Sequence, residues 1–520
     1  MTSRRDFMKL TGATLVTASI ASPLFGDSNK KHSNILLAIS DDHSYPHAGA
    51  YGCKFVRTPA FDRIAREGIL FNNAFVAAPQ CSPNRASILT GRNIWSNREA
   101  GTHSSLFPRD LTVYTDLLEK SGYHVGFTRK GWEPGNFEIT GWEHNPAGKE
   151  YSRIKNKTPA KKMDNADYAA NFEAFLADRS PGQPFCFWYG SKEPHRGYQK
   201  DAGVDHGGRP EDVTVPEYLP DTDEVRKDFL DYAFEIEWFD KHLGRMIETL
   251  EAAGELDNTL IVVIGDNGMP FPHAKATLYE DGIHVPLAIR WGSATPGGQM
   301  ANDLVSMIDL APTFLDAAGV PMPGTMQGRS LYKLLKSRQP EKYASDRRTF
   351  IVAGRERHTC ARLDNVGYPS RCIRTEKYLY IHNMKPERDF MGVQYDDVDD
   401  GPTKSLVLKG ETDESLRNFF ELSFAKRPEF ELYEITEDRA CLHNLAYDAK
   451  YKSVRTELHS KLHIILKQQG DPRVLGYGDV FESYPRFGEI RDLAGPDVKK
   501  GKYVKKFIQP NQSVTQECMP

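Results

Sequence analysis

The sequence predicts a doubly wound α/β fold, with a parallel sheet covered by helices on both faces, followed by a smaller C-terminal α+β domain. Short, nearly continuous apolar runs at residues 34–39, 185–189 and 260–264 have the pattern of strands buried on both faces of a sheet. Segments with helical spacing separate these runs, and strands that alternate with helices favour a parallel sheet. We place this core between residues 34 and 335.

Helices and shorter strands complete the expected order of elements. Residues 58–67 follow a Thr-Pro helix start and repeat their apolar positions at helical spacing. Residues 223–251 carry apolar side chains every three or four positions, which is typical of an amphipathic helix. Strand-like runs at 349–353 and 378–381 precede a third helix near 451–467, and these elements indicate the smaller domain.

The composition is that of a large globular enzyme. Of the 520 residues, 39% are hydrophobic and 11% aromatic, which provides material for a core and argues against a disordered chain. The 67 Lys and Arg nearly balance the 71 Asp and Glu, and a net charge of -4 gives little electrostatic drive toward nucleic acid. Seven cysteines without a Cys-x-x-Cys pair predict neither a disulfide scaffold nor a structural zinc site.

The first residues have the features of an export signal. Residues 3–9 (SRRDFMK) form a twin-arginine pattern, and residues 10–25 form a weakly apolar run that is shorter than the roughly 20 strongly apolar residues of a spanning helix. We expect a twin-arginine signal peptide at 1–26, a periplasmic or secreted protein and no membrane anchor. The alternative is a disordered basic tail. We further expect a catalytic domain at 27–340 and a C-terminal α+β subdomain at 345–520 with a loosely ordered tail.

Oxygen-bearing side chains follow two of the predicted strands. Asp41 and Asp42 come directly after the first strand, and the pair Asp266-Asn267 follows the third. Open α/β sheets bind ligands at the carboxyl ends of their strands, and hard oxygen donors favour calcium or magnesium over zinc or copper. We therefore expect a divalent cation here, although each pair taken alone is more often a helix cap or a turn.

The run CSPNRASILTGR at residues 81–92 contains the candidate nucleophile. Read locally, Cys81 is either a buried cysteine that opens a helix or a thiolate nucleophile close to Arg85. Only three residues separate the two, fewer than the oxyanion-binding loop of a thiol phosphatase requires. The Cys-x-Pro-x-Arg…Thr-Gly string resembles the signature of the sulfatase family, with Asn84 where that family commonly has a smaller residue. The resemblance covers nearly the whole mature chain and implies an alkaline-phosphatase-like fold, whose large central sheet is mixed but mostly parallel.

The resemblance also implies roles for these residues. A formylglycine-generating maturation enzyme would oxidise Cys81 to 3-oxoalanine (formylglycine), whose hydrate supplies a nucleophilic hydroxyl. Lys130 and Lys275 would neutralise charge on the sulfate, His195 would act as general acid, and Arg85 would orient the hydrate. The cation would be Ca²⁺, with the ligands Asp41, Asp42, Cys81, Asp266 and Asn267.

Three further residues are expected at the substrate. His43 and Arg196 are assigned to substrate contact. Trp132 stands where the family usually has a histidine two residues after its lysine, so we expect His103 or His144 to assist sulfate release instead. Trp132 would stack on a sugar ring, although a buried indole is the commoner role.

Plainer explanations exist for several of these residues. Without the resemblance, Lys130 and Lys275 are ordinary solvated cations, and His195 is a turn residue. In the C-terminal domain, Arg374 and His382 are candidates to line the substrate pocket.

Further motifs narrow the expected activity. The strings at residues 194–196 (PHR) and 266–272 (DNGMPFP) look similar to those of the heparan N-sulfatases, or sulfamidases. We therefore expect an exported sulfatase that acts on a sulfated mono- or oligosaccharide during polysaccharide degradation. The alternatives are an O-sulfatase on algal sugars, a phosphohydrolase of the same superfamily, and a carbohydrate-binding relative without turnover.

Overall fold

The computed structural model describes residues 32–337, 347–487, 490–491 and 503–504, so the predicted signal peptide and most of the predicted tail lie outside the described residues. Its central sheet has eight strands in the order β5-β4-β6-β1-β7-β8-β2-β9. Neighbouring strands are parallel except where β8 pairs with β7 and β2. The predicted mixed, mostly parallel sheet is thereby confirmed. Its strands are β1 (Asn34–Ser40), β2 (Ile69–Phe71), β4 (His124–Arg129), β5 (Lys149–Glu150), β6 (Phe185–Gly190), β7 (Thr259–Gly265), β8 (Leu287–Trp291) and β9 (Gln299–Ala301).

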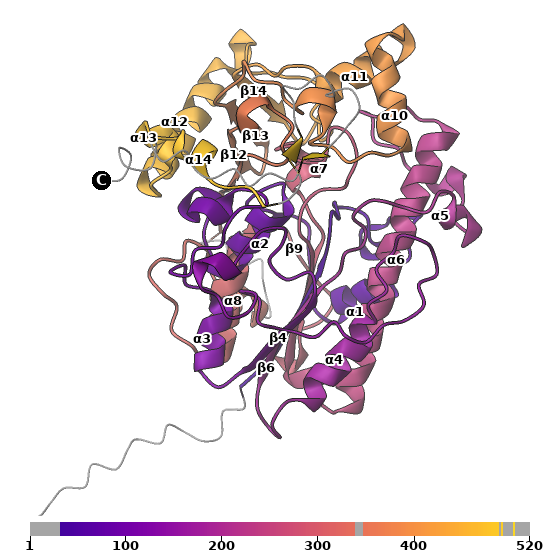
Figure 1. Ribbon diagram of the computed structural model, residues 1–520, viewed down its shortest axis with the longest axis vertical. Helices are drawn as coiled ribbons and strands as arrows, with labels where there is room; N and C mark the ends of the chain where they lie inside the picture. Colours follow the sequence, from indigo (N-terminus) through magenta and orange to yellow (C-terminus); the bar gives the residue numbers. More distant parts are fainter. Residues whose placement is uncertain (1–31, 338–346, 488–489, 492–502, 505–520) are drawn as a thin grey trace, which may run out of the picture. The chain divides into compact units, whose positions relative to one another are not determined.

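Helices cover both faces of this sheet (Figure 1). One face carries α1 (Pro59–Glu67), α4 (Tyr168–Ala177) and α6 (Asp223–Ala252), and the other carries α2 (Cys81–Thr90), α3 (Tyr114–Lys120) and α8 (Leu310–Ala318). The long helix α6 begins where the side chain of Thr222 accepts a hydrogen bond from the backbone N–H of Val225. Such a cap satisfies a backbone donor that has no partner within the helix.

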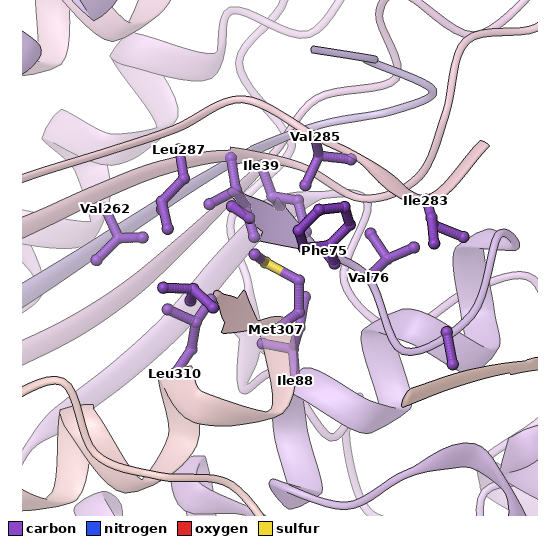
Figure 2. Close-up of a cluster of buried hydrophobic side chains, with 14 of the residues drawn as sticks. Ile39, Phe75, Val76, Ile88, Val262, Ile283, Val285, Leu287, Met307 and Leu310 are labelled. Atoms are coloured by element: carbon purple, nitrogen blue, oxygen red, sulfur yellow. The ribbon is translucent and has the colours of Figure 1, made fainter. Parts of the chain in front are cut away.

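The core forms because successive residues of a buried strand point to opposite faces of the sheet. On β1, Leu36 belongs to the apolar cluster under α1, α4 and α6, whereas Ile39 belongs to the cluster under α2, α3 and α8. Figure 2 shows the second cluster, in which Ile39 and Val262 of the sheet lie near Ile88 of α2 and Leu310 of α8. An apolar run such as 34–39 therefore buries both of its faces, as the sequence pattern predicts.

A second, antiparallel sheet forms the smaller C-terminal domain, which is also confirmed. Its strands are β11 (Phe350–Arg355), β12 (Ser370–Thr375), β13 (Tyr378–Asn383) and β14 (Phe430–Glu434), in that order. Helix α12 (Lys452–Gln468) covers this sheet, and its Leu462 belongs to the same buried cluster as Ile373 and Tyr380. Shorter helices complete this part: α10 (Pro402–Leu408), α11 (Arg417–Phe424), α13 (Pro472–Leu475) and α14 (Val480–Ser483).

Buried polar contacts join the second sheet to the loop that follows β7. Arg374 of β12 donates two hydrogen bonds, of 2.8 and 2.9 Å, to the carboxylate of Glu280 in α7 (Glu280–Ile283), and both side chains are buried. The two ring nitrogens of His273 lie 2.7 and 2.9 Å from the carbonyl oxygens of Leu422 and Ala440. Arg374 is therefore part of the contact between the two sheets.

The remaining elements are short. Strands β3 (Ala74–Phe75) and β10 (Val305–Ser306) form one two-stranded pair, and β15 (Ile490–Arg491) and β16 (Tyr503–Val504) form another. Two four-residue helices are α5 (Ala202–Asp205) and α9 (Tyr332–Leu335). Among the described residues, no helix combines the length and the apolarity needed to cross a bilayer.

Candidate active site

Four oxygen-bearing side chains meet at the carboxyl ends of β1 and β7. These strands pair in parallel and end level with each other, so the residues that follow them lie side by side. Asp42 donates its backbone N–H to the carboxylate of Asp266 (2.9 Å), and the Asn267 amide donates to Asp42 (2.6 Å). A carboxylate oxygen of Asp41 lies within 4.8 Å of one of Asp266. The structure thus brings four of the five predicted cation ligands together in a buried cluster.

Cys81 begins α2 and lies beside this cluster. Its sulfur, an oxygen of Asp41 and an oxygen of Asp266 are all within 4.8 Å of one another, and only 2% of the residue is exposed. Burial, followed by the charge of Asp41, raises the pKa of the thiol well above its usual value. Because the thiolate is the reactive form of cysteine, these surroundings do not favour direct attack by Cys81 as a thiolate.

Each carboxylate of the cluster pairs with a buried cation. The three ion pairs are Lys130–Asp41, Lys275–Asp42 and Arg85–Asp266, and in the last the Arg85 Nε donates over 2.8 Å. Burial disfavours ionisation of Asp41, but the surrounding cations, Lys130 foremost, together lower the pKa of this carboxyl below its usual range. At Asp266, burial and the charge of Asp41 raise the pKa to about 6. Additional positive charge at this point would favour the ionised carboxylate.

Two buried oxygens of the cluster have no hydrogen-bond partner among the described residues. They are Oδ1 of Asp41 and Oδ1 of Asn267. An unpartnered buried oxygen destabilises the fold, whereas calcium and magnesium take carboxylate and amide oxygens as ligands. This part of the site therefore fits a hard divalent cation.

A cavity of about 720 Å³ opens beside the cluster. Asp41, Lys130 and His195 belong to its lining, together with Glu133, Lys162, Lys192 and Glu235. The side chain of His195 is 35% exposed, and its Nε2 lies 3.8 Å from the carboxylate of Asp42. Its Nδ1 donates to the carbonyl of Arg196 (2.6 Å), so Nε2 is the ring nitrogen directed toward the cluster.

His43 and Arg196, which we assigned to substrate contact, form hydrogen bonds within the protein. One ring nitrogen of His43 lies 3.0 Å from the Ser40 hydroxyl and the other 2.7 Å from the His47 carbonyl, and burial lowers the pKa of His43 to about 4. Arg196 borders the cavity, but its guanidinium donates two hydrogen bonds, of 2.8 and 2.7 Å, to Asp228 of α6. Both side chains are thus held by partners within the protein, and their expected contact with substrate stays a prediction.

Trp132 lies in the interior rather than on the cavity wall. Only 1% of the residue is exposed, its Nε1 donates to the backbone carbonyl of Ser82 (3.0 Å), and its ring meets the edge of Phe107 with centroids 5.0 Å apart. The predicted stacking on a sugar does not hold in this structure, because no face of the indole is open. The hydrogen bond to Ser82 instead supports the first turn of α2, next to Cys81.

The two histidines considered as substitutes lie in different surroundings. His103 is buried, and its Nδ1 lies 3.1 Å from the carbonyl of His358. Burial, then His358 and cations that include Lys275, lower the pKa of His103 well below its usual value, so the ring is neutral. His144 is partly exposed and lies 4.0 Å from Glu119. Of the two, His103 is the one close enough to the site for the charges of Lys275 and Lys130 to lower its pKa.

Sequence reasoning missed one carboxylate of the site. Asp399 lies 3.5 Å from the Nζ of Lys275, and one of its oxygens is within 4.8 Å of His195 and Asp42. Burial opposes its ionisation, but Lys275 and then His195 lower its pKa below the usual range. The surrounding run at 396–400 (DDVDD) is typical of a solvated loop, so no local signal marks Asp399. Only the packing of the C-terminal domain brings it to the site.

The chain matches two family models and several curated proteins. The model described as Sulfatase covers residues 33–320, and the model described as N-sulphoglucosamine sulphohydrolase, C-terminal, covers residues 271–403. An ulvan-active sulfatase of Formosa agariphila is 28% identical over 447 residues, which is 84% of this chain and 80% of the relative. The N-sulphoglucosamine sulphohydrolase of Homo sapiens is 28% identical over 491 residues, 86% of this chain and 93% of the relative.

Solved structures share the fold. The structure of BT4656 in complex with its substrate D-glucosamine-2-N,6-O-disulfate has a TM-score of 0.61 at 23% identity and covers 85% of this chain and 99% of that one. The phosphonate monoester hydrolase of Agrobacterium radiobacter also has a TM-score of 0.61, at 17% identity, over 85% of this chain and 97% of its own. The fold alone therefore does not select the reaction, and the residues at the site must do so.

Proposed function

Because the chain belongs to the sulfatase family, we propose that it hydrolyses sulfate groups of sulfated carbohydrates with an aldehyde made from Cys81 as its nucleophile. The position of Cys81 carries this proposal. The residue begins α2 beside Asp41 and Asp266, and Asp41 with Lys130 lines the adjoining cavity. A nucleophile at this position would lie beside carboxylates that fit a cation and close to Lys130, whose charge favours an anionic substrate.

The proposed nucleophile requires one modification and two steps. A maturation enzyme with an external oxidant such as O₂ replaces the sulfur and two hydrogens of the Cys81 side chain by a carbonyl oxygen, and water adds to the aldehyde. One hydroxyl of the hydrate loses its proton and attacks sulfur in line, the bond from sulfur to the sugar oxygen or nitrogen breaks, and the leaving atom takes a proton. The second hydroxyl then loses its proton, re-forms the aldehyde and expels sulfate. A serine or a thiol lacks this second hydroxyl and would stay sulfated.

We propose Ca²⁺ as the resident cation. Its ligands would be oxygens of Asp41, Asp42, Asp266, Asn267 and the modified Cys81. When bound, the cation withdraws charge from the sulfate and from the attacking hydroxyl. The unpartnered buried oxygens of Asp41 and Asn267 support this assignment.

The chain's own cations and one histidine would complete the site. The buried ammonium groups of Lys130 and Lys275 compensate the charge on the sulfate oxygens. Arg85 also donates to the backbone carbonyl of Lys130 (2.6 Å), so one guanidinium holds both the strand end and the helix that bears Cys81. Nε2 of His195, at the edge of the cavity, gives its proton to the leaving oxygen or nitrogen.

The substrate we propose is a sulfated mono- or oligosaccharide. The cavity lining mixes cations such as Lys162 and Lys192 with carboxylates such as Glu133 and Glu235. Such a mixture suits a polyhydroxylated ring that also carries anionic groups. The match of residues 271–403 to the C-terminal model of N-sulphoglucosamine sulphohydrolase favours an N-sulfated sugar, and the ulvan-active relative favours an O-sulfated algal sugar as the second candidate.

We also propose that the protein is exported through a twin-arginine signal at 1–26 and works in the periplasm or outside the cell. The proposed catalytic domain, 27–340, and C-terminal subdomain, 345–520, both reach the site, since Asp399 lies beside Lys275. A phosphomonoester or phosphonate hydrolase is a further candidate, because the Agrobacterium radiobacter enzyme has a similar fold.

Mass spectrometry of the Cys81 peptide tests the nucleophile. Protein made in a host with the maturation enzyme should show the aldehyde and lose reaction with thiol reagents. It should release sulfate from N-sulfated or O-sulfated glucosamine, and Cys81→Ala should lose this activity at least about 1000-fold while it keeps its melting temperature. An unmodified thiol in fully active protein would disprove the mechanism. Phosphate release without sulfate release would select the phosphohydrolase, and sugar binding without either would select the non-catalytic relative.

A further inference from the structure

Three histidines gather on the second sheet, in a part of the chain that the sulfatase chemistry does not use. His459 and His463 lie one turn apart on α12, and His382 lies on β13 beneath them. The ring centroids are 4.2 Å apart for His459 and His463, 5.2 Å for His382 and His463, and 5.4 Å for His382 and His459. All three are partly buried, so the group is within reach of solvent.

The ring nitrogens converge on one point. Nδ1 of His382 lies 3.1 Å from Nε2 of His463, and one nitrogen of each of the three rings lies within 4.8 Å of the others. Two nitrogens bound to the same tetrahedral Zn²⁺, each at about 2.0–2.1 Å, would be about 3.3 Å apart. The first pair is already near this spacing, and a small rotation of His459 on its helix would bring in the third nitrogen.

The opposite nitrogens of two rings have the partners that metal-bound histidines usually have. Nδ1 of His459 lies 2.8 Å from the hydroxyl of Tyr380, and Nε2 of His382 lies 3.7 Å from a carboxylate oxygen of Glu429. A ligand histidine commonly donates its second N–H to an oxygen, which fixes the ring and its tautomer. These contacts leave Nε2 of His459 and Nδ1 of His382 free to accept a cation.

Neutral imidazole is the form that binds a metal, and the surroundings favour it. Burial lowers the pKa of His382 to about 4 and also lowers the pKa of His459 and His463. The neighbouring cations Arg371, Arg455 and Lys467 add to these shifts.

We propose that His382, His459 and His463 bind one Zn²⁺ that links α12 to the second sheet. Three imidazole nitrogens are soft enough to prefer zinc to calcium, which separates this site from the oxygen cluster beside Cys81. Water supplies the fourth ligand. The site has a stabilising role, since it joins a helix to the strand on which it packs.

Zinc titration of the full-length protein tests the proposal. The protein is freed of metal with a chelator, returned to millimolar Ca²⁺ to fill the oxygen cluster, and titrated with Zn²⁺ by calorimetry. The wild type should bind one more Zn²⁺ than the double variant His459→Ala/His463→Ala. Zinc should also raise the melting temperature of the wild type by about 2–4 °C and leave that of the double variant unchanged. His443→Ala, which removes a histidine that is 80% exposed, is the matched control and should behave as wild type.

Cobalt provides a second, direct measurement. Co²⁺ at a tetrahedral site with nitrogen ligands absorbs strongly in the visible range, and wild-type protein should show this absorption while His463→Gln should not. Equal zinc stoichiometry in wild type and the double variant, or a cobalt spectrum unchanged by His463→Gln, would overturn the proposal. If the double variant does not fold, the wild-type spectrum and the single variant decide the question.

Discussion

The contact between the two sheets gives a quantitative test of the fold. Arg374 and Glu280 form a two-fold hydrogen-bonded ion pair whose side chains are only 5% and 1% exposed. Arg374→Met leaves the charge of Glu280 buried, with its other ion-pair partner His284 3.2 Å away. Removing one member of a buried pair typically costs about 3–5 kcal/mol of unfolding free energy, and we expect a loss in this range.

The assay is urea unfolding followed by tryptophan fluorescence, on a double-mutant cycle of Arg374→Met, Glu280→Gln and both. The double variant should recover most of the loss, because no charge is left unpaired. Lys377→Met is the control: its partner Glu434 is also 2.8 Å away, but the lysine is 53% exposed, so we expect a change below about 1 kcal/mol. A loss at Arg374→Met no larger than that of Lys377→Met would refute the reasoning.

The same pair should give the stability a defined pH dependence. Burial opposes ionisation of Glu280, but Arg374 lowers its pKa well below the usual range. A carboxyl with a lowered folded-state pKa contributes its full stability above its unfolded pKa of about 4.3, and this contribution is lost as the pH falls toward the folded value. The difference between wild type and Arg374→Met should therefore shrink below about pH 4.

Three further predictions concern the site. His195→Ala should lower kcat on sugar sulfates by about 100- to 10,000-fold but lower it much less on 4-nitrophenyl sulfate, whose leaving group needs no proton; equal losses on both substrates would rule out the acid role. Calcium removal with EGTA should abolish turnover and lower the melting temperature. Ca²⁺ at about 100 times its Kd should restore about 2.7 kcal/mol of unfolding free energy, and the absence of a thermal shift would argue against a resident cation. Trp132→Ala should destabilise the protein by about 3–5 kcal/mol, because it empties a buried volume under α2, and unfolding in urea measures this; an unchanged stability with a raised KM would restore the sugar-stacking role.

The sequence predicts the parts of this protein that depend on local pattern. The apolar runs at 34–39 and 260–264 mark β1 and β7, and the parallel pairing of these strands is enough to bring Asp42 and Asp266 together. Residues 58–67 and 223–251 likewise anticipate α1 and α6 within one residue at each end. Local pattern succeeds here because burial on both faces of a strand leaves a nearly continuous apolar signal.

Features that depend on distant packing could not be predicted. The guanidinium of Arg196 is satisfied by Asp228, which lies 32 positions away on α6, and Asp399 reaches Lys275 only through the C-terminal domain. Trp132 looks the same in a sequence whether it lines a cavity or fills the interior. In each case the deciding fact is which partner the tertiary structure supplies, and no local spacing encodes it.

The burial of α2 limits when a modifying enzyme can reach Cys81. All ten residues of this helix are buried, and Cys81 is its first. A second enzyme cannot reach that sulfur once the chain has closed around it, so the proposed conversion of the thiol would have to precede the folding of this segment. A polypeptide that completes its folding before it meets the oxidising enzyme should therefore remain inactive. Refolded, unmodified protein that is then supplied with that enzyme tests this, because it should gain no activity.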